Sequence, residues 1–155
     1  MLYVIVMVGC GGENGRERGN SYTRLEGVPF LLPIEHDFST SSIFFDVSLT
    51  EAEEANGTVS IVLDAGMGVT NTVSSFNDLR ELVGVINAQI FSPLPPEVNI
   101  GIFAEGVDLG NGTFQITFVA QEPGFSSVIR ISDESGSASE IGLSSSLVSI
   151  PGELR

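Results

Sequence analysis

The chain has 155 residues, a length that fits one domain whose core needs no disulfide or metal for stability. Twenty acidic residues stand against six arginines and no lysine, so the net charge of −14 excludes a nucleic-acid partner, which needs a basic surface to displace counterions from phosphate. A hydrophobic content of 42% excludes a disordered chain, and 18 glycines with 7 prolines between β-type runs favour a fold rich in strands and turns.

The N-terminal region, residues 1–24, combines an apolar run with a glycine-rich tether. The run from Leu2 to Val8 is too short to cross a bilayer, which takes about 20 apolar residues. It ends in Met7-Val-Gly-Cys10, which resembles the lipobox of bacterial lipoproteins and so implies that Cys10 is lipidated. The alternative is a β-branched strand packed on the sheet, with Cys10 as a small buried residue. The protein contacts a membrane only if Cys10 is lipidated.

Residues 25–155 are expected to form a single α+β domain. Within residues 43–49, apolar side chains at every second position predict a strand with one buried side. A second strand is expected over residues 57–64, after the turn formed by Asn56 and Gly57. The sole histidine lies in the segment Glu35-His36-Asp37. Because a zinc site takes three or four nitrogen or sulfur ligands, we expect a solvated charged loop at His36 and no metal.

A helix is predicted over about residues 75–90. Ser75 can accept hydrogen bonds from the free N–H groups of the first turn, and Asp78 suits the positive end of the helix dipole. With about 100° between successive residues, the large apolar side chains fall on one face. They are Phe76, Leu79, Leu82, Val83, Ile86 and Ile90. This face is expected to pack on a sheet.

The segment after the helix is stiffened by three prolines between residues 93 and 96. It could present Phe91 and Leu94 to a protein partner at little entropic cost. The alternative is that the prolines end the helix and Phe91 packs beneath it. Phe125, after Pro123 in a later turn, is a third candidate partner contact with the same alternative.

Three further strands are predicted near residues 98–104, 113–120 and 127–132. The first two form a hairpin with a loop over residues 105–112. Together with the two earlier strands they make a mostly antiparallel sheet, with the helix packed across one face and linking two strands that are candidates for parallel neighbours. The expected core is Phe76, Leu79, Leu82, Val83, Ile86, Ile61, Leu63, Ile100, Ile102, Phe114, Ile116, Phe118, Ile129 and Ile131.

This order of elements resembles the flagellin hook-type inserted motif over about residues 57–143. The resemblance is carried by a Val-Ile-Asn-Ala helix around Asn87, a Phe-x-Ile-Thr strand, a Pro-Gly-x-Ser-x-Ile-x-Ile strand and a closing Ile-Gly-Leu at Gly142. The motif occurs in outer domains of flagellins and hook-associated proteins, and a similar pattern occurs in phage tail sheath proteins. The resemblance implies a surface-exposed structural domain, an extracellular or cell-surface location (or a virion), and partners that are other subunits of a homo-oligomer or filament.

The sequence offers no convincing catalytic or cofactor-binding group. The serine-rich segments lack the strand–Gly-x-Ser-x-Gly–helix setting of a nucleophile elbow, and the loop acids lack the spacing of a calcium motif. We therefore expect a protein that is not an enzyme and has no cofactor. The leading hypothesis is a structural or interaction domain of an extracellular filament. The alternatives are a phage tail or virion component and a lipid-anchored bacterial surface binding module.

Overall fold

The computed structural model describes residues 22–51, 54–69, 72–91, 100–123 and 127–152. Its elements follow one another as β1 (Tyr22–Glu26), β2 (Phe30–Leu31), β3 (Ile43–Glu51), β4 (Glu54–Leu63), the 3-10 turn η2 (Ala65–Met67), α2 (Phe76–Phe91), β5 (Ile102–Asp108), β6 (Thr113–Pro123), β7 (Ser127–Ser132) and the 3-10 turn η3 (Ser137–Ile141). Within these residues no helix is long and apolar enough to cross a membrane.

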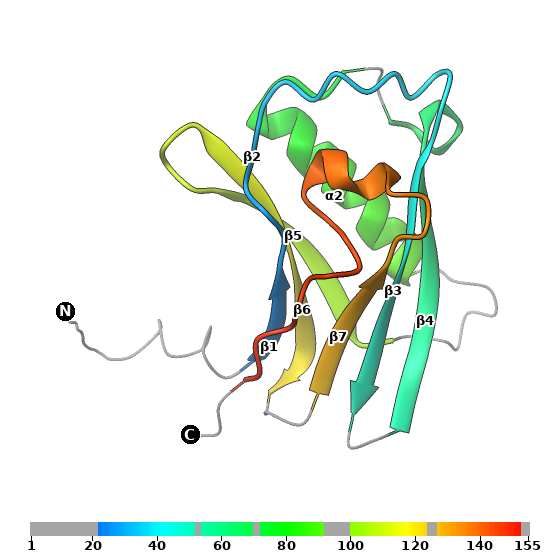
Figure 1. The fold of residues 1–155 in the computed structure, drawn as a ribbon, viewed down its shortest axis with the longest axis vertical. Helices are drawn as coiled ribbons and strands as arrows, with labels where there is room; N and C mark the ends of the chain where they lie inside the picture. The colour runs from blue at the N-terminus through cyan, green and yellow to red at the C-terminus, as the bar shows by residue number, and fades with distance from the viewer. Residues whose placement is uncertain (1–21, 52–53, 70–71, 92–99, 124–126, 153–155) are drawn as a thin grey trace.

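The strands form two antiparallel sheets (Figure 1). In the first, called the β6 sheet, β6 pairs with β5 along one side and with β1 and β2 along the other. In the second, the β3 sheet, β3 lies between β4 and β7. The predicted α+β class and antiparallel pairing are confirmed. The expectation of one continuous sheet is wrong, because β6 and β7 follow each other in the chain but pair with different partners.

Helix α2 connects the two sheets and packs against both of them. It leaves the β3 sheet after β4 and leads into β5 of the β6 sheet, so the expectation of parallel neighbours on either side of the helix is wrong. Figure 1 shows α2 in the space between the two sheets. Its apolar face is buried as predicted, apart from Phe76, which is half-buried.

Two amide side chains of α2 bind the backbone of the nearest strand in each sheet. Asn87 donates from Nδ2 to the Ala104 carbonyl (3.0 Å) and accepts from the Ala104 N–H at Oδ1 (2.7 Å). Gln89 does the same to Val62, with distances of 2.8 and 2.9 Å. Each amide satisfies the donor and acceptor that another strand would otherwise pair. The helix therefore occupies part of the edges of β5 and β4.

The core is continuous through both sheets and the helix. Every residue of the predicted core is buried except Phe76 and Phe114, whose rings stack at the margin with centroids 5.8 Å apart. Several fully buried residues were not predicted, among them Leu25, Phe38 and Leu143. They lie in irregular or short segments, where periodicity is too brief to identify a buried side.

The β5–β6 hairpin is confirmed, but its strands run further than predicted. Asp108 pairs with Phe114, so the connection shortens from the predicted residues 105–112 to residues 109–112. Glu105 and Val107 consequently belong to β5. Their side chains point away from the core, on the opposite face from the buried Ala104.

The N-terminus of α2 has the predicted cap. The Ser75 hydroxyl accepts from the Asp78 N–H (3.1 Å), and the Asp78 carboxylate accepts from the N–H groups of Ser74 (3.0 Å) and Ser75 (3.2 Å). The Ser74 N–H and hydroxyl, with the Ser75 groups, hold the pKa of Asp78 below its ordinary value of 3.8. The cap is therefore strongest when Asp78 is ionised.

Acidification should weaken this cap in the wild type. In Asp78→Asn, which has no carboxylate to protonate at this position, the same weakening should be absent. Because the folded-state pKa is lowered, Asp78 stabilises the fold above pH 3.8, and this contribution is lost as the pH falls through the folded-state pKa. We expect the difference in urea midpoint between wild type and Asp78→Asn to shrink as the pH is lowered from about 6 to about 3. Gly84→Ala is the control, since Gly84 lies exposed in the middle of α2 with nothing within 4 Å of the added methyl; it should stabilise the helix by about 1 kcal/mol with little dependence on pH. A difference for Asp78→Asn that persists at low pH would contradict the prediction.

Candidate interaction surface

The outward side of the β6 sheet carries a hollow that is lined by described residues of three strands. Side chains on β1, β5 and β6 alternate between the core and this outer face, so three strands each present every second residue. The hollow has a volume of about 810 Å³. Its lining consists of Tyr22, Arg24, Glu26, Phe103, Glu105, Val107, Leu109, Gln115, Thr117, Val119, Ala120 and Gln121.

The hollow coincides with an irregularity in the pairing of β1 and β6. Arg24 faces Val119, whereas Tyr22, only two residues earlier, faces Pro123 four residues later in β6. The two extra residues on β6 form a bulge, and bulges bend a strand and redirect its side chains.

Across the outer face the side chains stand in rows that cross all three strands. Val119 has Arg24 on one side and Phe103 on the other. Thr117 likewise lies between Glu26 and Glu105. Thr117 is only 7% exposed although its side chain points outward, so neighbouring side chains cover it. The two carboxylates therefore flank a shielded hydroxyl in the middle of the hollow.

The charges of this face do not cancel. Arg24 donates from Nε to the Glu26 carboxylate at 2.9 Å. Glu105 is exposed and forms no ion pair with any residue in the described part of the chain. The lining thus holds two carboxylates and one guanidinium, on a protein whose net charge is −14.

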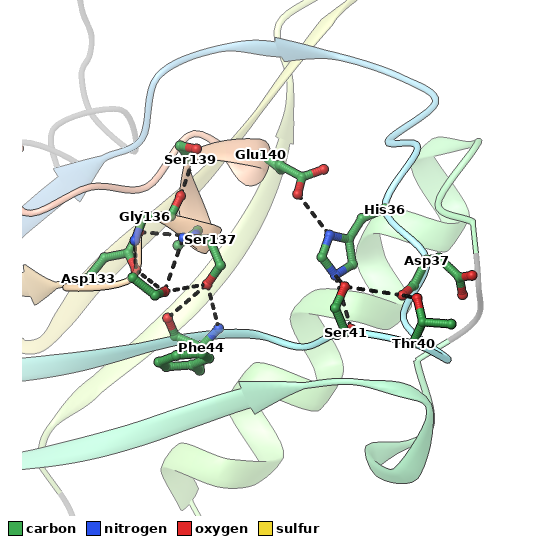
Figure 2. Close-up of polar contacts among 12 residues, drawn as sticks. His36, Asp37, Thr40, Ser41, Phe44, Asp133, Gly136, Ser137, Ser139 and Glu140 are labelled. Atoms are coloured by element: carbon green, nitrogen blue, oxygen red, sulfur yellow. Dashed lines mark hydrogen bonds and ion pairs between the residues drawn. The ribbon is translucent and has the colours of Figure 1, made fainter.

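A second polar cluster surrounds His36, and here the expectation of a solvated loop is wrong. The histidine is 9% exposed, and its ring contacts that of Phe38 with centroids 4.6 Å apart. Nδ1 lies 2.8 Å from the Glu140 carboxylate, and Nε2 lies 3.1 Å from the Ser41 carbonyl oxygen (Figure 2). The alternation of Ile34, His36 and Phe38 was a sequence signal that could have predicted this burial.

Glu140 reaches His36 because the start of the turn that carries it is held by two sets of hydrogen bonds. Asp133 accepts hydrogen bonds from the N–H groups of Gly136 and Ala138, both at 3.0 Å. The Ser137 hydroxyl accepts from the Phe44 N–H at 3.1 Å and so joins η3 to β3 (Figure 2). These contacts place the Glu140 carboxylate over the loop that contains His36.

Ser41, His36 and Glu140 stand in the order of a nucleophile, a base and an orienting carboxylate. The Ser41 hydroxyl lies 3.2 Å from Nε2, within reach of a proton transfer. The same nitrogen lies 3.1 Å from the Ser41 carbonyl oxygen, so Nε2 is within hydrogen-bond distance of both oxygens of Ser41. Both ring nitrogens thus have hydrogen-bond partners within the fold, and His36 links its loop to η3.

The residues singled out from the sequence lie apart from the hollow or outside the described residues. Phe91 is the last residue of α2, is 43% exposed and does not line the hollow. Leu94, Phe125 and Cys10 lie outside the described residues. Their roles as partner contacts and lipidation site stay predictions. Within the described ranges, no three histidine, cysteine, aspartate or glutamate side chains are grouped closely enough to hold a metal ion.

The outer face itself was missed at the level of sequence. Alternation in residues 103–107 and 115–119 identifies two outward stripes that mix apolar and polar side chains. The third stripe, on β1, begins at Tyr22, inside the range predicted as N-terminal run and tether. Without β1 the rows that cross the sheet could not be assembled.

No family model and no curated protein matches the chain. Among solved structures it is similar to the D1-D2-D3 domains of the flagellar cap protein FliD from Escherichia coli, with 12% identity and a TM-score of 0.45 over 85% of this chain and 33% of that one. It is also similar to the D2-D3 domains of the same protein, with 10% identity and a TM-score of 0.44 over 85% of this chain and 61% of that one. The chain thus spans less than two thirds of either structure. The similarity does not single out the flagellin hook-type motif.

Proposed function

We propose that this protein is a non-enzymatic, surface-exposed structural domain of an extracellular filament, and that it binds neighbouring protein subunits through the outer face of the β6 sheet. The observation that carries the proposal is the hollow of about 810 Å³ on that face. Apolar side chains of Tyr22, Phe103, Val107 and Val119 line it beside charged and amide groups. Aromatic and aliphatic groups ringed by polar ones are the usual composition of a protein interface.

The chemistry of the hollow supports binding over catalysis. The described residues that line it include no histidine, cysteine or serine, so it offers no common nucleophile with an adjacent base. The His36 cluster lies elsewhere, and its ring nitrogens bond to Glu140 and Ser41. The proposal therefore assigns His36 to the stability of the fold.

The filament setting rests on the resemblance of residues 57–143 to the flagellin hook-type motif. A phage tail or virion component would use the same face with different neighbours. The Met7-Val-Gly-Cys10 segment favours a further candidate, a lipid-anchored surface module, whose partner would be a protein of the cell envelope. All three functions share a protein-binding outer face.

Photo-crosslinking in the source organism tests this proposal. A photoreactive amino acid at Val107, on the outer face, should crosslink to a neighbouring subunit in filaments that electron microscopy shows to contain the protein. The matched control is the same substitution at Thr58, an exposed strand residue of the β3 sheet. Equal crosslinking from the two positions would exclude the outer face as the docking site, and protein found only as monomers would exclude the filament.

A further inference from the structure

We propose that the outer face of the β6 sheet binds an extended segment of a partner subunit in which one lysine or arginine lies between two apolar residues, in the pattern apolar-x-basic-x-apolar. This inference rests on the proposed function and adds the chemistry of the partner. It follows from the order of the rows on the sheet and from their charges.

The outward side chains of β5 are apolar, acidic and apolar in turn: Phe103, Glu105 and Val107. One row runs from Arg24 over Val119 to Phe103, the next holds the carboxylates of Glu26 and Glu105, and the following one holds Gln115 and Val107. Successive rows are two residues apart on each strand, which corresponds to about 6.7 Å. An extended segment laid along the strands repeats its own side chains at the same interval, so its residues i, i+2 and i+4 would meet the three rows in turn.

The central row calls for a positive charge. Neighbouring strands lie about 4.8 Å apart, so Glu26 and Glu105, with β6 between them, are separated by about 10 Å at the backbone. A cationic side chain placed over Thr117 would stand between the two carboxylates. Arg24 already pairs with Glu26 at 2.9 Å, which leaves Glu105 as the main contact. One added cation brings the summed charge of Arg24, Glu26 and Glu105 from −1 to zero.

Charge also argues against a second copy of this chain as the occupant. Two molecules with a net charge of −14 repel each other as they approach, and two such faces would bring carboxylates together. A partner with a basic residue at the centre of an apolar pair would be attracted instead. The same field favours association with basic surfaces and disfavours acidic ones.

Peptide titrations followed by NMR on the isotopically labelled full chain test the inference. The probe is the blocked peptide Ser-Val-Thr-Arg-Thr-Val-Ser, whose valines and arginine have the required spacing. It should shift the amide signals of residues 103–107 and 117–119. Two comparison peptides should bind at least tenfold more weakly: the permuted Ser-Arg-Thr-Val-Thr-Val-Ser and a version with glutamate in place of arginine.

A matched pair of variants locates the charge. Glu105→Gln should weaken binding of the probe about three- to fivefold, the range of an exposed ion pair, and the loss should diminish at high salt. Glu81→Gln removes an equal charge from the exposed side of α2 and should leave binding unchanged. Equal binding of the three peptides, equal effects of the two variants, or no shifts on the outer face would each overturn the inference. Crosslinking from Val107 in any of those cases would still support the proposed function.

Discussion

Replacing Gly142 with alanine should lower the free energy of unfolding by about 3–5 kcal/mol. Gly142 has a φ of +78°, and a Cβ built on it would lie 2.1 Å from the Val28 carbonyl oxygen. Because the obstacle is backbone, it cannot turn away as a flexible side chain could. The alanine would have to push the segment around Val28 outward and break the hydrogen bond from the Val28 N–H to the Gly142 carbonyl, which is 2.8 Å long.

Gly136→Ala is the matched control for this variant. Gly136 has nearly the same φ, +79°, at the other end of η3, but a Cβ added to it would meet nothing within 4 Å. It should therefore cost only the strain of a left-handed alanine, about 1–2 kcal/mol. Urea unfolding of the two variants separates the cost of a left-handed alanine backbone from the cost of the contact between the added Cβ and Val28. Equal losses would show that the contact with Val28 does not determine the stability of this junction.

Asn87→Ala should be the second most damaging of the proposed substitutions, at about 2–4 kcal/mol. The substitution removes both hydrogen bonds to Ala104, a residue that is 3% exposed, and leaves a donor and an acceptor on the edge of β5 without their partner. An alanine favours the helix by a few tenths of a kcal/mol, which offsets only a small part of the loss. Hydrogen exchange should show faster exchange of the Ala104 amide as well as a lower global stability.

Asn77→Ala provides the control for Asn87→Ala on the same helix. Asn77 is exposed and its amide reaches only Glu81, at 3.3 Å, so its removal should change stability by no more than about 0.5 kcal/mol. A loss at Asn87 no greater than that at Asn77 would mean that the edge of β5 is held by packing alone. Gln89→Ala should fall between the two, because its bonds to Val62 are exposed to water.

Asn87 and Gly142 both belong to the short motifs that carry the resemblance to the flagellin hook-type insert. The structure explains them physically: Asn87 pairs with the edge of a strand, and Gly142 permits a turn to approach the backbone near β2. The β1 part of the outer face of the β6 sheet lies outside these motifs. A protein could therefore keep the motifs and still present a different surface to its partners.

Local patterns in the sequence were sufficient for the α2 cap, its buried face, the β5–β6 hairpin and nearly all of the predicted core. Each depends on residues within one element, where periods of 3.6 and 2 directly report which side is buried. Phe76 and Phe114 differ because they lie at the margin of the core, where burial depends on neighbours from other elements.

The tertiary structure alone decided which strands share a sheet and what the outer face contains. Glu26, Thr117 and Glu105 form one row although β1 and β6 are far apart in the chain, and His36 meets Glu140 across 104 residues. Pairing of distant strands is determined by register, bulges and the closing of long loops, and none of these leaves a local periodic signal. The candidate binding surface of this protein is therefore a product of long-range strand pairing.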